Sequence, residues 1–313
     1  MRKSIFLVVV IFFVLALVIS GCASSPTAEP DPPAEQSAEA QKTNVPATVP
    51  PEPTETTIPT PTPLPGSLVL PVESFAHEIP WLPMDESGLP GTYYYAFNVA
   101  KPPYNSVLVR QAFIAATDRE ALTNIVLKYQ EGPRPATSFT PPQILGRDLY
   151  NEIGIPYDPD RARDLLEQAG YTDTSKFPTL TLLTNISGGN TPYLHINVAE
   201  ALAVMWQENL GITVVVEYLD WETYLNLVNT DTPEIYRMGW AGDYNDPDNF
   251  LREVFGSGSE VNHGGFTNTE YDELVNSAAE ITDPAERQVL YIQAEQILCE
   301  DEAVLIPIYH TIY

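Results

Sequence analysis

The distribution of apolar and polar positions divides the chain into three regions. An unbroken apolar run extends from Ile5 to Ile19, directly after two basic residues. A polar stretch follows, with twelve prolines and no aromatic side chain between positions 23 and 66. From about position 92 onward, short β-rich runs alternate with segments whose apolar residues recur at helical spacing. The pattern therefore indicates an apolar leader, a stretch without a core of its own, and a globular region.

The alternating region predicts an α/β fold, in which helices cover the strands of a sheet. The β-rich runs predict strands at 92–98, 179–185, 212–219, 235–242 and 303–309. The helical patterns predict helices at 106–129 (with a break near Asp118), 158–170, 194–211, 221–228, 268–281 and 283–301. An aspartate followed by a proline begins two of these helices, which places a capping side chain before a favourable first residue.

The apolar leader is too short for a typical membrane-spanning helix. Its basic start and apolar middle predict a secretory signal peptide over residues 1–22. It closes with "VISGC", which resembles the lipobox of bacterial lipoproteins, where the signal is cut before the cysteine and the cysteine is acylated. The resemblance implies lipidation of Cys22 and an extracytoplasmic protein held at the cell membrane by a lipid anchor. The alternative is an uncleaved membrane helix with a chance cysteine.

Residues 23–66 predict a disordered linker, because a stretch rich in proline and poor in large apolar residues cannot bury enough surface to fold. Proline favours the extended polyproline II conformation, which behaves as a semi-rigid spacer. We expect this linker to hold the globular region, residues 67–313, away from the membrane.

Composition and charge exclude several classes of function. The formal net charge of −27 argues against a nucleic-acid partner, which requires basic residues to neutralise phosphates. Cys299 lies in a helical pattern and predicts a buried core residue, with no disulfide partner once Cys22 is lipidated. The four histidines lack metal-ligand spacing, and there is no phosphate-binding glycine loop. We therefore expect no metal, no cofactor and no enzymatic activity. A hydrolase using Asp243 and Asp246 as paired carboxylates is an alternative without a specific motif.

Several segments occur in an order that resembles one protein family. They include "TYYYAFNVAKPPYNSVLVRQAFIAATDRE", "YDPDRARDLLEQAGY", "MWQENLGITVVVEYLDWETYL", "RMGWAGDYNDPDNFL" and "IPIY". From about Gly91 to Tyr313 the chain resembles the C-terminal lobe of the family 5 extracellular solute-binding proteins, the peptide receptors of ABC importers. The resemblance implies the C-terminal lobe of a type II (cluster C-like) periplasmic-binding-protein fold, with a mixed sheet covered by helices. It also implies a peptide ligand and ABC transporter permease subunits as partners.

The chain departs from this family in one respect. Family members close two lobes on a ligand, whereas here the proline-rich linker runs almost directly into the counterpart of the second lobe. We therefore expect residues 67–313 to be a C-terminal lobe whose first lobe is not recognisable in the sequence. An alternative is an orphan or truncated lobe that acts as a surface interaction module without a role in transport.

The stretch "GWAGDYNDPDNFL", residues 239–251, carries the expected ligand contacts. In the family, the strand that corresponds to Arg237–Ala241 pairs with the peptide backbone. The small residues Gly239, Ala241 and Gly242 suit such pairing, because another backbone can approach them closely. The resemblance assigns Asp243 to the peptide's α-ammonium group. The alternative for Asp243 is a turn or capping residue.

Three further residues complete the expected site. The resemblance assigns Arg237 to the peptide's α-carboxylate and His195 to a position near the same end of the ligand. Trp240 would shape a side-chain pocket or simply pack. The alternatives are a surface strand residue for Arg237 and a helix-start residue for His195. Asp246 and Asp248 predict a turn and the start of a helix, with Pro247 in its first turn.

Overall fold

The computed structural model describes residues 90–126, 133–186 and 192–311. All of them belong to one compact unit, Pro65–Tyr313. The predicted signal peptide, Cys22 and the predicted linker lie outside the described residues.

The main sheet has four antiparallel strands in the order β2-β6-β1-β5. Its strands are β1 (Gly91–Phe97), β2 (Arg134–Pro135), β5 (Ile235–Ala241) and β6 (Leu305–Thr311). The central strand β1 pairs with β6 on one side and with β5 on the other, so β5 forms an edge of this sheet. In the pairing with β5, Tyr95 lies opposite Arg237 and Tyr93 lies opposite Gly239.

A second sheet consists of two parallel strands, β3 (Leu180–Asn185) and β4 (Val214–Leu219). The long helix α5 (Pro192–Leu210) connects them, as a parallel pair requires. Most of the described side chains of α5 are buried, and Trp206 is fully buried. Because β3 and β4 are parallel, their carboxyl ends lie at the same edge of this two-stranded sheet.

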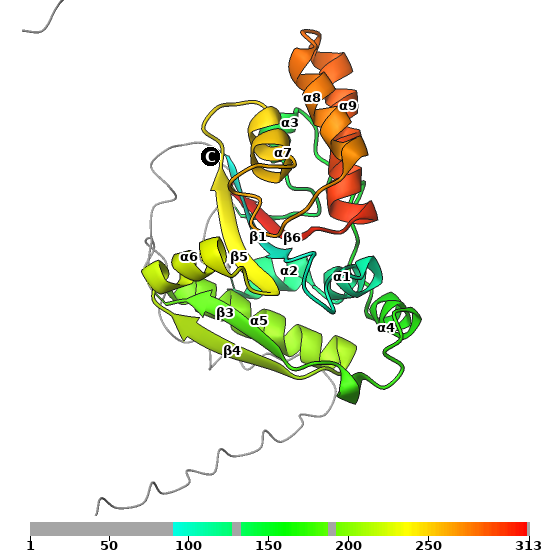
Figure 1. Cartoon of the computed structure of the whole chain (residues 1–313), viewed down its shortest axis with the longest axis vertical. Coiled ribbons are helices and arrows are strands. Elements are labelled where there is room, and N and C mark those ends of the chain that lie inside the picture. Colours follow the sequence, from blue (N-terminus) through cyan, green and yellow to red (C-terminus); the bar gives the residue numbers. More distant parts are fainter. Residues whose placement is uncertain (1–89, 127–132, 187–191, 312–313) are drawn as a thin grey trace, which may run out of the picture. The chain divides into compact units, whose positions relative to one another are not determined.

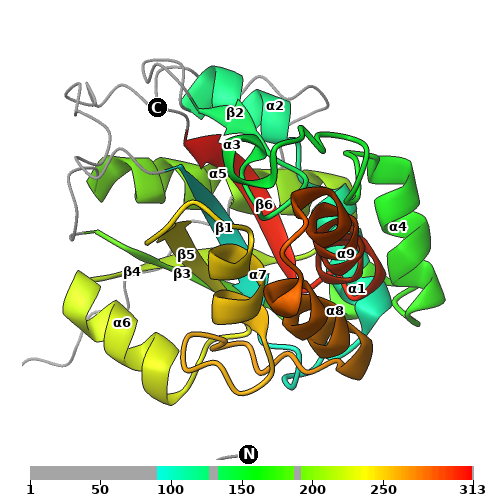
Figure 2. The same cartoon turned by 90° about the horizontal axis from the view of Figure 1, so that it is seen from above.

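Helices cover both faces of the main sheet, as Figures 1 and 2 show. They are α1 (Val107–Ala115), α2 (Arg119–Ala121), α3 (Pro142–Leu145), α4 (Pro159–Gln168), α6 (Trp221–Thr230), α7 (Asp248–Phe255), α8 (Thr269–Glu280) and α9 (Pro284–Gln296). Shorter helical turns are η1 (Leu122–Val126), η2 (Thr174–Lys176) and η3 (Ile297–Asp301). Side-chain caps begin several helices, including Asp158, which accepts from the Arg161 N–H, and Asp283, which accepts from the Glu286 N–H.

The alternation of side chains along β1 builds two hydrophobic cores. Tyr93, Tyr95 and Phe97 point into one core, together with residues of α1, α4 and α5. Tyr94 and Ala96 point into the other core, together with residues of α7, α8 and α9. The period of two along an extended strand places successive side chains on opposite faces. Both cores therefore depend on β1, which holds the two halves of the unit together.

The fold class predicted from the sequence is confirmed: the structure is α/β, with both parallel and antiparallel strands and with helices on both sides. The strands are divided between two sheets rather than joined in one. The strands and helices predicted within the described ranges are present, and Cys299 is buried as predicted. The short elements β2 and α3 were not predicted. Among the described residues, no helix has the length and apolar character to cross a bilayer.

Candidate functional site

The outward backbone groups of β5 are hydrogen-bonded in the first half of the strand and free of described partners in the second half. The backbone N–H of Arg237 donates to the Tyr224 hydroxyl at 2.6 Å, and that hydroxyl donates to the Arg237 carbonyl at 3.0 Å. Both backbone groups of Arg237 therefore point away from β1. Because this direction alternates along an antiparallel pair, the backbone groups of Gly239 and Ala241 also point outward. In the described part of the chain, no hydrogen bond reaches these outward groups.

Among the described residues, nothing in the packing requires a glycine at position 239. It is exposed, and a Cβ atom added there would meet only the Thr92 carbonyl oxygen, at 3.8 Å. Gly242, in contrast, is buried, and an added Cβ would lie 3.0 Å from the Phe250 ring. Packing within the unit therefore explains Gly242, whereas the bare edge at Gly239 suits the close approach of another backbone.

At the other end of this edge, Arg237 is buried in a cradle of aromatic and amide groups. Its guanidinium carbon lies 5.5 Å from the ring centroids of both Tyr93 and Trp221. One terminal nitrogen donates to Asn185 Oδ1 at 2.8 Å, while Nε is buried without a hydrogen-bond partner. No carboxylate of the described residues forms an ion pair with Arg237, which is only 7% exposed. A buried cation held in this way is a favourable place for an anionic group.

Two of the groups around Arg237, Asn185 and Trp221, are positioned by the parallel strands β3 and β4. Asn185 is the last residue of β3, and Trp221 begins α6 directly after β4. The carboxyl ends of parallel strands lie at the same edge of a sheet, so the two side chains reach Arg237 from one side. Tyr93 approaches from β1, where it lies two residues before Tyr95, the residue opposite Arg237, and therefore on the same face of the sheet. Three separate elements, β1, β3 and α6, therefore fix the orientation of one guanidinium.

His195, on α5, joins the same cluster as a neutral group. Its ring stacks on Tyr93 with centroids 5.6 Å apart, and its Nδ1 lies 3.2 Å from the Tyr93 hydroxyl oxygen. Burial, reinforced by the positive charge of Arg237, lowers the pKa of His195 to about 3. The imidazole is therefore uncharged at physiological pH, and it positions Tyr93 by a hydrogen bond rather than adding a second cation.

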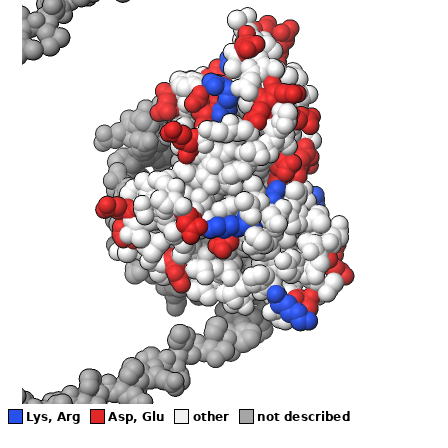
Figure 3. Space-filling model, viewed as in Figure 1, with Lys and Arg blue, Asp and Glu red and all other residues white. Residues whose placement is uncertain are grey.

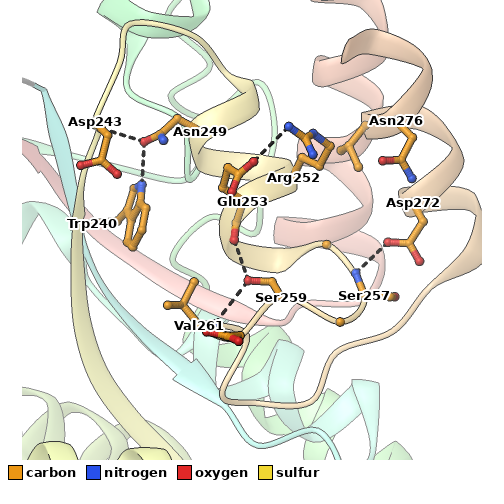
Figure 4. A pocket seen from close by; sticks show the side chains of 14 residues that line it. Trp240, Asp243, Asn249, Arg252, Glu253, Ser257, Ser259, Val261, Asp272 and Asn276 are labelled. Atoms are coloured by element: carbon orange, nitrogen blue, oxygen red, sulfur yellow. Dashed lines mark hydrogen bonds and ion pairs between the residues drawn. The ribbon is translucent and has the colours of Figure 1, made fainter. Parts of the chain in front are cut away.

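Asp243 lies beyond the free edge, beside Trp240 and Asn249, and it lines a pocket (Figure 4). It is exposed, and its backbone N–H donates to Asn249 Oδ1 at 2.9 Å. The same oxygen accepts from Trp240 Nε1 at 3.1 Å, so one amide on α7 positions both residues. The pocket measures about 590 Å³, and its wall includes Trp240, Asp243, Glu253, Ser257, Glu260 and Asp272.

Trp240 therefore lies in the pocket wall next to Asp243, and it also packs, so both roles that the sequence left open for it are compatible with its position. Its side chain is on the face of β5 opposite to that of Arg237, because the two residues differ by an odd number of positions. It packs against the core formed with α7, α8 and α9. The structure brings Arg237 and His195 together at one end of the edge, and Asp243 and Trp240 at the other.

The turn that presents Asp243 is fixed by ion pairs. Asp246 accepts from both terminal nitrogens of Arg287, at 2.7 and 2.8 Å. Asp248 accepts from Arg252 at 2.6 and 2.7 Å and from the Tyr244 hydroxyl at 2.8 Å. Asp246 also caps the start of α7 by accepting from the Asp248 N–H at 3.0 Å. The structural roles predicted for Asp246 and Asp248 are confirmed, while the Asp243 carboxylate takes no part in these ion pairs.

The surface around this site is acidic. In Figure 3, aspartates and glutamates gather over α8 and α9, and few basic residues lie on the same face. Such a surface attracts cationic solutes at long range and is screened by salt.

Sequence reasoning missed four residues of the Arg237 cluster, namely Tyr93, Asn185, Trp221 and Tyr224. Tyr93 was interpreted as a sheet residue, and its β-rich surroundings gave no sign of a second role. Tyr224 and Trp221 occupy a short amphipathic helix, where aromatic residues are typical of core packing. Only the tertiary structure reveals that Trp221 lies against the Arg237 guanidinium and that Tyr224 binds the Arg237 backbone.

Comparison with known proteins relates this geometry to a family. The family described as "Bacterial extracellular solute-binding proteins, family 5 Middle" matches residues 70–262. The periplasmic oligopeptide-binding protein OppA of Escherichia coli is 34% identical over 223 residues, which are 70% of this chain and 39% of OppA. The periplasmic murein peptide-binding protein MppA of Escherichia coli is 36% identical over 223 residues, 70% of this chain and 40% of MppA.

A solved structure shows the same similarity. The crystal structure of Haemophilus influenzae OppA in complex with the peptide RPPGFSPFR aligns with a TM-score of 0.62 at 30% identity, over 72% of this chain and 44% of that one. The chain thus spans about two fifths of the length of the curated relatives it matches.

Proposed function

The chain belongs to family 5 of the bacterial extracellular solute-binding proteins, and from this premise we propose that it binds peptides for uptake by an ABC importer. The observation that carries the proposal is the free edge of β5, which has a buried cation at one end and an exposed carboxylate at the other. These are the complements of the two termini of a peptide. Binding needs no covalent chemistry, and we assign no catalytic residue.

The peptide would extend the main sheet by one strand. Backbone groups of Gly239 and Ala241 would bond to the peptide backbone, which gives affinity for any side chain. With the α-ammonium at Asp243 and the α-carboxylate at Arg237, the peptide would run antiparallel to β5. Six residues of extended strand rise by at most about 20 Å, so a peptide of roughly four to six residues would engage both ends. A longer peptide would keep the Asp243 contact and lose the one to Arg237.

The pocket beside Asp243 would receive the side chain next to the peptide's α-ammonium. Its acids include Glu253, Glu260 and Asp272, of which Glu253 pairs with Arg252. Trp240 adds an aromatic wall that can pack against an aliphatic stem. We therefore expect a basic first residue to be favoured. The peptide named in the Haemophilus influenzae OppA structure begins with arginine, which is consistent with this expectation.

The remaining parts of the proposal rest on the sequence. A lipid on Cys22 would hold the protein on the outer side of the cell membrane, and the linker at 23–66 would give residues 67–313 reach to permease subunits. We propose that residues 67–313 correspond to a C-terminal lobe. Replacement Cys22→Ser tests the anchor: processing should stop and uptake of labelled palmitate should cease. Equal labelling of both proteins would overturn it. A surface interaction module without transport is the other candidate role, and loss of peptide uptake on gene deletion separates the two.

The α-ammonium assignment is tested by a double comparison in the full chain. A peptide of five residues is titrated in free and N-acetylated form against the wild type and Asp243→Asn. We expect acetylation to weaken wild-type binding by roughly 10- to 100-fold, since a charge-assisted hydrogen bond contributes about 1.5–3 kcal/mol. Acetylation should have little further effect on Asp243→Asn, because the acetyl group and the substitution remove the same contact.

The matched control is Glu260→Gln, which lies in the same pocket and is also exposed. It should leave the acetylation effect intact and reduce only the preference for a basic first residue. If acetylation and Asp243→Asn weaken binding independently, or if Asp243→Asn lowers the melting temperature markedly, Asp243 has a structural role and the assignment fails.

A further inference from the structure

The free stretch of β5 is complementary to a second copy of itself. The outward backbone groups belong to alternate residues, Arg237, Gly239 and Ala241. If two copies pair antiparallel about a two-fold axis at Trp240, Gly239 of each copy lies opposite Ala241 of the other. Both members of each pair then point their N–H and C=O groups at one another, which is the arrangement of a hydrogen-bonded antiparallel pair. A self-complementary surface of this kind generates a closed dimer.

The charges fit the same register. Pairing about Trp240 places Arg237 of each copy at the level of Asp243 of the other, and the two-fold axis repeats the match. Arg237 has no acidic partner among the described residues, and Asp243 makes no ion pair there. A register shifted by two positions would retain the backbone pairing but would separate these charges. The charge order therefore selects one register.

The side chains at the axis also support this register. Trp240 would face Trp240 of the second copy as a non-hydrogen-bonded pair, in which opposite side chains are closest. The indole is half-buried, so part of its surface is available for such a contact. The opposite edge of the sheet offers no equivalent, because β2 has only two residues and one of them is Pro135.

From these observations we propose that the chain forms a two-fold dimer by antiparallel pairing of β5, and that peptide and second copy compete for the same edge. The proposal rests on the peptide-binding role of that edge. In the dimer each copy presents to the other what a peptide would present: a backbone strand, a carboxylate at the level of Arg237 and a cation at the level of Asp243. The dimer would be a resting state that protects an exposed sheet edge, and a peptide would open it.

The register can be tested by disulfide trapping in the full chain carrying Cys22→Ser. Cα atoms of a hydrogen-bonded antiparallel pair lie about 5.5 Å apart, within disulfide range, whereas diagonal neighbours lie about 7–8 Å apart. We therefore expect that Gly239→Cys alone and Ala241→Cys alone give little covalent dimer on oxidation. Mixing these two single variants should give a covalent dimer at several times the yield of either alone. Cys299 is buried and serves as an internal background.

Two controls make the result specific. Val215→Cys lies on an exposed part of β4 and should not crosslink with either variant. Ala241→Pro, placed in the Gly239→Cys chain, removes an outward N–H but no bond to β1, so it should prevent trapping by the Ala241→Cys chain while leaving the melting temperature nearly unchanged. An unlabelled five-residue peptide in excess should lower the yield of the mixed dimer at least several-fold.

Different outcomes overturn different claims. Equal yields from the single variants and their mixture would overturn the register and, with it, the dimer. No trapping in a chain that still binds peptide would overturn the dimer and leave the proposed function standing. Trapping in the predicted register that peptide does not reduce would overturn competition. Trapping in a chain that binds no peptide at any concentration would support the dimer and count against the proposed function.

Discussion

The two halves of β5 have the same backbone conformation and opposite surroundings. In the first half, Ile235–Arg237 is buried, and the Tyr224 hydroxyl satisfies both outward groups of Arg237. In the second half, Gly239 and Ala241 are exposed, and their outward groups have no partner among the described residues. One strand therefore serves as scaffold at one end and as a binding edge at the other.

This difference shows where the fold ends and the site begins. In the first half of β5, the Tyr224 hydroxyl takes the place of a neighbouring strand by bonding to the outward N–H and C=O groups of Arg237. Beyond that point, the residues whose backbone groups point outward are the small Gly239 and Ala241, and no described residue covers the edge. The charged groups follow the same division: side chains of three elements hold Arg237 in the covered half, whereas Asp243 lies on a turn after the open half. The covered half fixes the position of the Arg237 guanidinium, and the open half leaves backbone groups exposed to a ligand.

The largest expected effect is a loss of folding stability when the Tyr224 side chain, which bonds to the edge of β5, is removed. Tyr224 is fully buried, so Tyr224→Ala should destabilise the protein by about 3–5 kcal/mol through the lost side chain. Tyr224→Phe should cost about 1–3 kcal/mol, because two buried backbone groups of Arg237 lose their partner. Chemical denaturation measures both values. Tyr244→Phe is the control, since Tyr244 is 42% exposed and should cost much less. Equal costs for Tyr224→Phe and Tyr244→Phe would contradict the covering role.

Acidification should lower the folding stability, through two buried histidines, and should leave the peptide affinity of the open edge unchanged. The pKa of His195 is lowered to about 3 by burial and by Arg237, and that of His310 is lowered to about 3 by burial. The unfolded chain binds protons on these residues below about pH 6.5, whereas the folded chain does not, so stability falls as the pH drops from 6.5 toward 3. At pH 5 each histidine should lower the free energy of unfolding by roughly 2 kcal/mol.

The peptide affinity of the still-folded protein should be nearly constant between about pH 5.5 and pH 7, because His195 is neutral and the peptide's α-amino group is charged throughout this range. His195→Gln should remove about half of the acid-dependent loss of stability attributed to the two histidines. Denaturation curves at several pH values, together with peptide titrations, measure both effects. An affinity that rises on acidification with a midpoint near pH 6.5 would show that His195 acts as a cation, contrary to this account.

Replacement of Arg237 should separate binding from stability. Arg237→Met roughly keeps the length of the side chain and removes a buried charge that has no acidic partner among the described residues, so stability should change by less than about 1.5 kcal/mol. Affinity for a free five-residue peptide should fall by roughly 10- to 100-fold, and a C-terminally amidated peptide should lose little. A large loss of stability with unchanged discrimination between the two peptides would make Arg237 a structural residue.

The smallest expected effect tests the open half. Gly239→Ala should stabilise the folded chain by about 0.4–1 kcal/mol, since the unit has space for a methyl group and glycine costs conformational entropy. Gly154→Ala is the matched control and should destabilise, because Gly154 has φ +89° and an added Cβ would lie 2.3 Å from the Thr137 carbonyl oxygen. Destabilisation by Gly239→Ala would indicate that the unit itself requires this glycine.

Much of the fold could be predicted from the sequence because its signals are local. Asp158 with Pro159 and Asp283 with Pro284 mark helix starts, and the period of apolar residues distinguishes strands from helices. The division into two sheets could not be predicted, since strand pairing depends on contacts between distant segments. The two-residue strand β2 was missed for the same reason: Arg134 and Pro135 join β6 only through residues about 175 positions away.

The site was predictable in part. The small residues and carboxylates of "GWAGDYNDPDNFL" stood out as a pattern, and the family resemblance gave Arg237, His195 and Asp243 expected roles. The charge state of His195 was not accessible, because burial and the neighbouring guanidinium set it. The face of β5 that Trp240 occupies follows from strand parity, whereas its hydrogen bond to Asn249 on α7 depends on the tertiary structure.

Hydrogen exchange at single-residue resolution tests the central claim most directly, that the outward edge of β5 binds the peptide backbone. The measurement compares the chain with and without a saturating five-residue peptide, at a protein concentration low enough to keep the peptide-free chain monomeric. The account predicts that peptide slows exchange of the outward amide protons of Gly239 and Ala241 by at least tenfold, and hardly changes the inward amides of Met238 and Trp240, which already bond to β1. Equal slowing of outward and inward amides would contradict the account. Slowing at other residues, with unchanged exchange of the Gly239 and Ala241 amides, would contradict it as well.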